Sequence, residues 1–162
     1  MLHIVEGNMF DDPMDYHVVT VNCLGVAGKG IALEAKRRYP QAMYQYRQKA
    51  LKGSYDPGHI YTQSTGVWRY NHPGRPVHQD QLILATTKAH WTDNSRMEWV
   101  HSILDELATF VQEHDWDPPM TVALPPLGAG LGGLNGASVL RAVRERFEFN
   151  HPHYAIYYYL PR

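Results

Sequence analysis

The chain has 162 residues, a formal net charge of −1, 44% hydrophobic residues and 19% charged residues. These values predict one globular domain with a buried core, and they exclude a disordered chain and a general affinity for polyanions. The single Cys23 excludes an internal disulfide, and no apolar run approaches the ~20 residues that span a bilayer. We therefore expect a cytoplasmic domain without membrane contact.

Strand and helix patterns alternate along the chain, which predicts an α/β fold of three layers. Residues 64–81 are the least regular part and predict a hairpin or projecting loop. A capping box of Ser95 and Glu98 opens the third helix. In chain order the expected elements are strands at 2–5 and 16–22, helices at 29–39 and 41–52, strands at 59–63 and 82–87, a helix at 95–114, a strand at 120–124, a helix at 137–147 and a strand at 154–160.

A glycine-rich turn joins the second strand to the first helix. Asn22 ends the β-branched strand, and Gly25, Gly28 and Gly30 follow within eight positions of it. Glycines let the backbone approach a ligand closely, while the free amides and dipole of a helix N-terminus favour phosphate. This stretch predicts a nucleotide-type ligand.

A second strand-to-helix turn, residues 125–136 (PPLGAGLGGLNG), contains five glycines. Ligands of open α/β sheets bind beyond the carboxyl ends of the strands, so both turns are expected at one crevice. Two such turns indicate a diphosphate held by main-chain amides from both sides. Neither has the spacing of a Walker loop or of a Rossmann fingerprint, which disfavours a kinase or dehydrogenase.

Lys88 follows the buried strand 82–87, where a desolvated amine could act as a nucleophile; the alternative is an ordinary strand-end lysine that contacts phosphate or solvent. Asn22 could orient a ligand hydroxyl or cap the turn. Cys23 is favoured as a small buried hydrophobe over a nucleophile. The histidines lack zinc-site spacing, so no metal is expected.

The last strand carries three consecutive tyrosines, Tyr157, Tyr158 and Tyr159. Side chains alternate between the faces of a strand, so Tyr158 is expected to point away from the other two. One of the three could stack on a purine, and core packing is the alternative.

Three motifs together resemble the macrodomain family: VNCLGVAGKGIALEAKRRYP at 21–40, TTKAHW at 86–91 and LPPLGAGLGGL at 124–134. The branch they resemble most contains the DarG antitoxins, relatives of the terminal ADP-ribose glycohydrolases. The resemblance implies a single macrodomain over residues 1–162, with a central mixed sheet between helices. It also implies an ADP-ribose cleft and no cofactor.

The resemblance assigns Lys88 as the catalytic residue, acting either as a nucleophile or through its charge. It places Asn22 at the distal ribose, residues 128–133 around the diphosphate, and Asn8 near adenine, where many macrodomains carry an aspartate. The implied ADP-ribose contacts are Asn8, Met9, Asn22, Gly28, Lys29, Gly30, Ile31, Ala32, Thr87, Leu127, Gly128, Ala129, Gly130, Leu131, Gly132, Gly133 and Tyr159.

Gly132 separates two substrate classes within the resemblance. The branch that acts on protein glutamate carries an aspartate there, whereas the DarG type shares the glycine and removes ADP-ribose from thymidine in DNA. We therefore expect a glycohydrolase acting on ADP-ribosylated single-stranded DNA, which reverses the modification made by a toxin. The alternatives are hydrolysis of another adduct (a glutamate ester, O-acetyl-ADP-ribose or ADP-ribose phosphate) and a non-catalytic ADP-ribose reader.

The expected partners are the modified DNA and a cognate ADP-ribosyltransferase toxin, and the chain is expected to be a monomer. DarG antitoxins carry a further toxin-binding region, so a chain ending at Arg162 is expected to be either an excised domain or a stand-alone enzyme. Nucleic-acid contacts could come from exposed basic and aromatic residues, although these could equally form a solvated helical face and cover the core. They are Lys36, Arg37, Arg38, Arg47, Lys49, Lys52, Trp68, Tyr70, Arg75 and Trp91.

Overall fold

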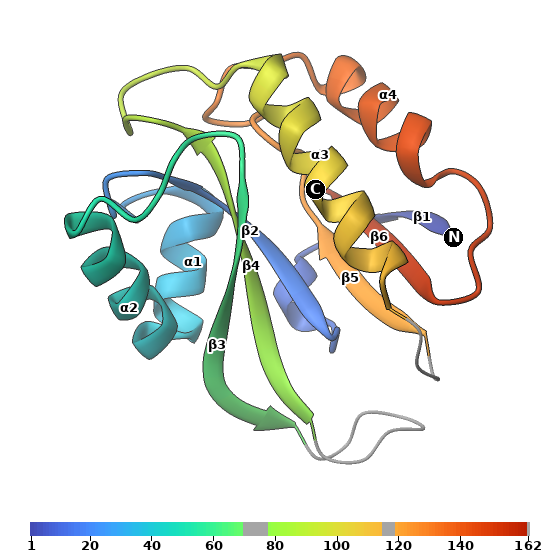
Figure 1. The fold of residues 1–162 in the computed structure, drawn as a ribbon, viewed down its shortest axis with the longest axis horizontal. Coiled ribbons are helices and arrows are strands. Elements are labelled where there is room, and N and C mark those ends of the chain that lie inside the picture. The colour runs from blue at the N-terminus through green and yellow to red at the C-terminus, as the bar shows by residue number, and fades with distance from the viewer. Residues whose placement is uncertain (70–77, 115–118, 162) are drawn as a thin grey trace.

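A six-stranded mixed sheet forms the centre of the computed structural model, which describes residues 1–69, 78–114 and 119–161 (Figure 1). The strand order is β1-β6-β5-β2-β4-β3; neighbouring strands pair in parallel except β3 and β4, which are antiparallel. The strands are β1 (Leu2–Glu6), β2 (Tyr16–Asn22), β3 (Ile60–Arg69), β4 (His78–Lys88), β5 (Met120–Leu124) and β6 (Tyr154–Leu160).

Helices cover both faces of the sheet, as the alternating pattern predicts. Figure 1 shows α1 (Gly30–Arg38) and α2 (Pro40–Leu51) on one face, with α3 (Met97–Gln112) and α4 (Gly136–Phe147) on the other. The chain turns between α1 and α2 because Pro40 cannot continue the first helix but fits the first position of the second. The three-layer α/β prediction is confirmed. None of the helices in the described residues is long and apolar enough to cross a membrane.

Each sheet face has its own apolar cluster, and the strand residues alternate between them. Val18 packs in the cluster under α3 and α4, whereas Val19 packs in the cluster under α1 and α2. In β6, Tyr158 belongs to the first cluster, and Tyr157 and Tyr159 face the second. The predicted alternation of the three tyrosines is therefore confirmed.

The hairpin of β3 and β4 is longer than the sequence pattern indicates. Residues 64–69 and 78–81 belong to the two strands, so the hairpin expected within 64–81 is confirmed, while the strands expected at 59–63 and 82–87 extend further than predicted. Pairing continues through a register irregularity between Ser64 and Trp68, which hides the strand pattern from a reading of periodicity. Tyr70 and Arg75 lie outside the described residues.

The capping box expected at Ser95 and Glu98 is wrong. Helix α3 begins at Met97 after Arg96, which makes no side-chain cap hydrogen bond. Ser95 is 5% exposed, and its backbone N–H donates to the carbonyl of Gly132 at 2.9 Å. A tertiary contact with the second glycine-rich turn thus replaces the local cap.

Candidate functional site

Three adjacent parallel strands deliver the predicted site to one edge of the sheet. β2 ends at Asn22 and lies between β5, which ends at Leu124, and β4, which ends at Lys88. We call residues 22–30 the first loop and residues 125–136 the second loop. Because the carboxyl ends of parallel strands share an edge, both loops and Lys88 lie together, as the sequence predicts.

Leu131 connects these three parts. The Lys88 ammonium (Nζ) donates a hydrogen bond to the Leu131 carbonyl at 3.0 Å. The Leu131 side chain reaches the first loop, where a Cβ added to Gly30 would lie 3.2 Å from its Cδ1. We call this contact of Lys88, Leu131 and Gly30 the Leu131 bridge. Leu131 lies 43 positions from Lys88 and 101 positions from Gly30 in the sequence, so only the fold brings these three residues together.

Lys88 is half-buried, so the expectation of a buried amine is wrong. Residues 82–87 of β4, which precede Lys88, are buried. The Lys88 amine itself extends to the carbonyl of Leu131, which is an exposed residue of the second loop. The amine is therefore accessible to a ligand that can compete for this hydrogen bond.

Asn22 organises the first loop. Its Oδ1 accepts hydrogen bonds from the backbone N–H groups of Leu24 and Val26 at 3.0 and 3.2 Å, and its Nδ2 donates to the Val26 carbonyl at 2.8 Å. The Tyr46 hydroxyl donates to the Asn22 carbonyl at 2.6 Å and lies 3.1 Å from Oδ1. The turn-capping alternative for Asn22 is thus present in the structure. Binding of a ribose by the same side chain stays a prediction.

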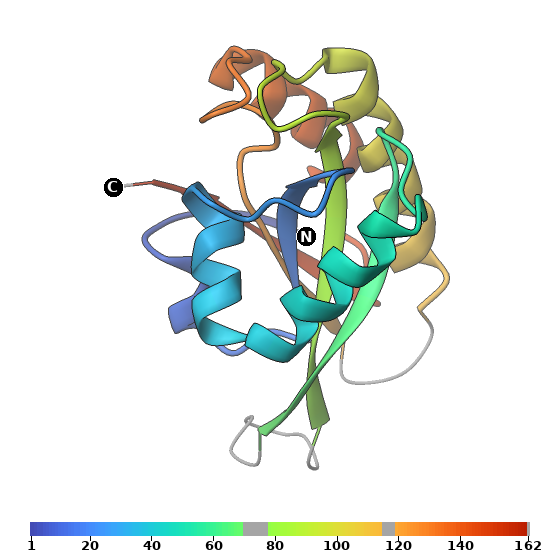
Figure 2. The ribbon, with the colours of Figure 1, turned by 90° about the vertical axis from the view of Figure 1, so that its left-hand side faces the viewer.

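The second loop packs tightly on the segment between β4 and α3. These two connections lie side by side in Figures 1 and 2, and the Ser95–Gly132 hydrogen bond joins them. A Cβ added to Gly132 would lie 2.5 Å from the Ser95 hydroxyl oxygen, 2.7 Å from the Gly128 Cα, and closer still to the Gly128 carbonyl oxygen. Gly132 is therefore required by space rather than by an unusual backbone angle.

Main-chain amides are available on both loops. The first amides of α1 have no intrahelical acceptor, and Gly28, Lys29 and Gly30 at this end are exposed. In the second loop, no hydrogen bond within the described residues engages the amides of Gly130 and Leu131. Two sets of N–H donors at one edge of the sheet suit a ligand with two linked phosphates.

The family profile named Macro domain matches residues 18–143, which include both loops and Lys88. The chain belongs to the macrodomain family. A DNA ADP-ribosyl glycohydrolase of Thermus aquaticus is 37% identical over 149 residues, which cover 91% of this chain and 38% of that protein. Its counterpart in Mycobacterium tuberculosis is 32% identical over 148 residues, covering 91% and 39%. This macrodomain thus spans about two fifths of the length of these curated relatives.

Solved structures give the same family. The macrodomain of Mycobacterium tuberculosis DarG has a TM-score of 0.83 at 31% identity and covers 100% of this chain and 99% of that one. Thermosipho africanus DarTG in complex with ADP-ribose has a TM-score of 0.77 at 27% identity, covering 97% of this chain and 41% of that one. The resemblance read from the three sequence motifs is confirmed.

Several predicted ADP-ribose contacts of this macrodomain are buried. Met9, Ala32, Thr87 and Leu127 are at most 8% exposed, so any contact they make would come chiefly from main-chain atoms. Tyr159 is 5% exposed and its hydroxyl donates to Asp12, which leaves little of its ring for stacking on a purine. Their roles stay predictions.

Asn8 follows β1, and its side chain is held by two hydrogen bonds. Its Oδ1 accepts from the Phe10 N–H at 3.0 Å and caps the short 3-10 helix η1 (Met9–Asp11), while its Nδ2 donates to Glu34 on α1. The side chain is exposed. The predicted contact with adenine would have to share these hydrogen-bonding groups.

Two further predictions concern the chemistry of the site: the role of Cys23 and the expected absence of a metal. Burial and the nearby Asp56 carboxylate raise the pKa of the Cys23 thiol to about 11, so the neutral thiol dominates at neutral pH and a thiolate nucleophile is excluded. No group of three or more potential metal ligands is assembled within the residues that the structure describes.

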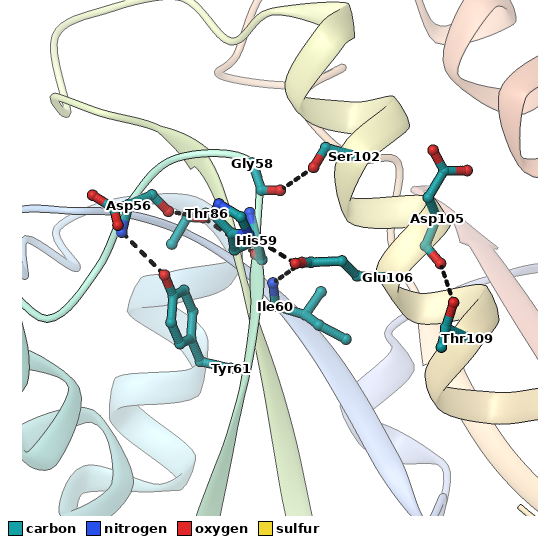
Figure 3. A network of polar contacts seen from close by, with 10 residues as sticks. All are labelled: Asp56, Gly58, His59, Ile60, Tyr61, Thr86, Ser102, Asp105, Glu106 and Thr109. Atoms are coloured by element: carbon teal, nitrogen blue, oxygen red, sulfur yellow. Dashed lines mark hydrogen bonds and ion pairs between the residues drawn. The ribbon is translucent and has the colours of Figure 1, made fainter. Parts of the chain in front are cut away.

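A network that the sequence analysis missed fixes the end of β4 (Figure 3). The Thr86 hydroxyl donates to the Asp56 carbonyl at 2.7 Å, and the Thr86 carbonyl accepts from the Gly58 N–H at 2.8 Å. The Ser102 hydroxyl on α3 donates to the Gly58 carbonyl at 2.6 Å, and His59 contacts Glu106 at 2.7 Å. These contacts hold the backbone two residues before Lys88. Thr86 and Thr87, the two threonines before Lys88, were the sequence feature that could have indicated this network.

Proposed function

We propose that this macrodomain is an ADP-ribosyl glycohydrolase that releases ADP-ribose from thymidine in single-stranded DNA. The observation that carries the proposal is the Leu131 bridge, because it sets the amine of Lys88 against both amide-rich loops. An amine at that junction is suited to chemistry next to a bound diphosphate rather than on the phosphates themselves.

In this proposal the loop amides, Asn22 and Lys88 have separate roles. Amides of both loops bind the diphosphate, and the first loop, shaped by Asn22, holds the distal ribose. Lys88 exchanges its hydrogen bond to Leu131 for contact with the sugar whose glycosidic bond is cut. As a nucleophile it adds to the anomeric carbon of the ring-opened sugar; the bond from that carbon to thymine breaks, the base leaves with a proton, and water hydrolyses the resulting imine to release ADP-ribose. Alternatively, its charge stabilises the departing base while water attacks the anomeric carbon.

Gly132 supports DNA over a protein ester as the substrate. A catalytic carboxylate at this position would need a Cβ, and the Gly128 backbone occupies that space. This loop is therefore built to work without an added carboxylate, as expected for the DarG type. The relatives named DNA ADP-ribosyl glycohydrolases support the same substrate class.

We further propose a cognate ADP-ribosyltransferase as a partner and a monomeric state for this domain. A Thermosipho africanus relative, 30% identical over 145 residues, is named a DNA ADP-ribosyl transferase–DNA ADP-ribosyl glycohydrolase fusion protein, which supports the pairing of the two activities. The basic residues of α1 and α2 named above are exposed and available to DNA, although Arg38 pairs with Asp11 and Lys49 bonds Gln63.

The proposal is tested with two substrates and three proteins. Wild type, Lys88→Ala and Lys88→Arg are incubated with a thymidine-ADP-ribosylated oligonucleotide and with a glutamate-ADP-ribosylated protein, and released ADP-ribose is measured. We expect wild type to prefer the oligonucleotide and Lys88→Ala to lose at least about 100-fold in rate. Lys88→Arg separates the two roles, because a guanidinium retains the charge but is not a nucleophile at neutral pH.

Binding of free ADP-ribose, measured by calorimetry, is the control for the cleft. We expect Lys88→Ala to retain binding of ADP-ribose, because the main-chain amides of both loops remain. Binding without release from either substrate would identify a reader, and release from the protein alone would identify an ester hydrolase. Full activity of Lys88→Ala would reject the catalytic assignment.

A further inference from the structure

An exposed tryptophan lies three residues beyond Lys88. Trp91 is 53% exposed and belongs to the connection between β4 and α3. The same connection is joined to the second loop, because Ser95 bonds Gly132 and a Cβ added to Gly133 would lie 3.1 Å from the Asn94 Oδ1. The connection that carries Trp91 therefore borders the second loop.

The turn that carries Trp91 is held by its own hydrogen bonds. The His90 Nδ1 lies 2.7 Å from the Thr92 hydroxyl and 3.2 Å from its N–H, and the Asp93 N–H donates to the His90 carbonyl at 3.1 Å. The His90 ring stacks on Trp91 with centroids 5.7 Å apart and planes 26° apart. The His90 ring thus lies against one face of the Trp91 indole and helps to fix its orientation.

Core packing does not account for Trp91. Trp99, by comparison, packs against Gly58 and carries the Arg96 guanidinium 4.8 Å from its ring centroid. Of the aromatic side chains that are more than half exposed in the described residues, Tyr44 lies on α2 and Phe149 lies beyond the end of α4. Trp91 is the one of these three that neighbours Lys88.

Each connection at this edge of the sheet presents one exposed apolar side chain. Leu24 of the first loop is 43% exposed, Leu131 of the second loop is 62% exposed, and Trp91 supplies the third. Exposed apolar side chains on the connections that also carry the free amides suit a ligand that has a charged part and a flat apolar part. A nucleobase attached to ADP-ribose has this composition.

We propose that Trp91 is the platform on which a base of the ADP-ribosylated single strand stacks while Lys88 acts on the adjoining sugar. This inference rests on the proposed function, since it assumes a DNA substrate. Bases of single strands stack on aromatic rings without regard to sequence, so Trp91 selects for nucleic acid over other carriers of ADP-ribose. It is a specificity residue, and the cleft binds ADP-ribose without it.

The test compares Trp91→Ala, Trp91→Phe and Phe149→Ala, the last being a matched control with a 51% exposed aromatic ring. The probes are a thymidine-ADP-ribosylated oligonucleotide and free ADP-ribose. We expect Trp91→Ala to lower kcat/KM on the oligonucleotide about 5- to 100-fold, the range for loss of one base–aromatic stack. Trp91→Phe should retain most of the activity. All three variants should bind free ADP-ribose within about twofold of wild type, as expected for sites that are not part of the cleft.

A second readout keeps this inference separate from the proposed function. Affinity for the modified oligonucleotide is measured by fluorescence anisotropy with Lys88→Ala and with the Lys88→Ala/Trp91→Ala double variant. If wild type releases no ADP-ribose, the proposed function fails, and a weaker affinity of the double variant still supports Trp91. Unchanged oligonucleotide affinity and kcat/KM in the Trp91→Ala proteins would overturn the inference and leave a protein partner for this surface. Equal losses for free ADP-ribose would also overturn it, because Trp91 would then belong to the cleft itself.

Discussion

The two loops of the candidate site are both rich in glycine, but only the second contains a glycine whose absent side chain, and not its backbone angle, is what the packing requires. In the first loop, Gly25 and Gly30 have φ angles of +83° and +59°, and Gly28 has open space around its Cα. In the second loop, Gly132 has no positive φ and instead lies against the backbone of Gly128. Gly128 and Gly133 of the second loop also have positive φ angles, +70° and +76°, so both loops need the backbone freedom of glycine. Only the second loop adds a glycine, Gly132, that is required by space alone.

The two loops also differ in what holds them in place. A single side chain, Asn22, ties the first loop to the end of β2 through three hydrogen bonds, and its Oδ1 also accepts from the Tyr46 hydroxyl of α2. The second loop is held by direct packing on Ser95 and Asn94. Removing atoms should therefore damage the first loop, and adding atoms should damage the second.

The largest effect is expected from Gly132→Ala. The new methyl group overlaps the Gly128 backbone, which cannot rotate away as a side chain can, so we expect a loss of about 3 kcal/mol in the free energy of unfolding. Urea denaturation measures this loss. Gly130→Ala is the matched control, because nothing lies within 4 Å of its added Cβ. Equal stability of the two variants would contradict the packing account.

Asn22→Ala should rank second. It leaves the N–H groups of Leu24 and Val26 without their acceptor in a partly buried site, while the Tyr46 hydroxyl keeps its bond to the carbonyl of residue 22, and we expect a cost of about 2 kcal/mol. Asn22→Asp keeps the acceptor but replaces the donor to the Val26 carbonyl, so its stability should lie between those of wild type and Asn22→Ala. Thermal unfolding of the three proteins checks the order, and a neutral Asn22→Ala would show that the loop does not depend on this side chain.

Gly30→Ala should cost less, about 1 kcal/mol, because its positive φ disfavours a side chain while the neighbouring Leu131 Cδ1 can move away. Gly28→Ala is the control, since its φ is not in the left-handed region and its surroundings are open. We expect ADP-ribose affinity, measured by calorimetry, to fall for Gly30→Ala as the Leu131 bridge is displaced. The same affinity in both variants would separate the bridge from ligand binding.

Ser95→Ala should have the smallest effect on stability, within about 0.5 kcal/mol. The hydroxyl is buried and has no hydrogen-bond partner in the described residues, so its removal loses no bond. Combining it with Gly132→Ala sharpens the comparison. If the double variant regains the stability of Ser95→Ala, the hydroxyl rather than the Gly128 peptide limits the space at residue 132.

The sequence predicted the fold best where one periodicity extends over a whole element. β2, β5 and β6 match the expected boundaries because their strands are buried on a regular pattern. The β3–β4 hairpin was underestimated because its register shifts between Ser64 and Trp68. The start of α3 was misplaced because Ser95 bonds the distant Gly132, which no local rule can detect.

The candidate site was likewise predictable only in part. The two loops and Lys88 were predictable, since each follows a strand whose end must reach the same edge. The contact of Lys88 with Leu131 was not predictable, because it depends on the path of a loop that lies 43 positions further along the chain. The hydrogen bonds of Asn22 within its own turn were weighed as an alternative, and the structure contains them.

The packing at Gly132 also constrains how this loop can change over generations. One nucleotide change converts a glycine codon into an aspartate codon, yet here the new side chain would meet the Gly128 peptide, which no replacement of residue 128 removes. A descendant can gain a carboxylate at this position only together with a new backbone path between residues 128 and 132. A change of residue 132 alone is therefore not enough to give this loop a carboxylate.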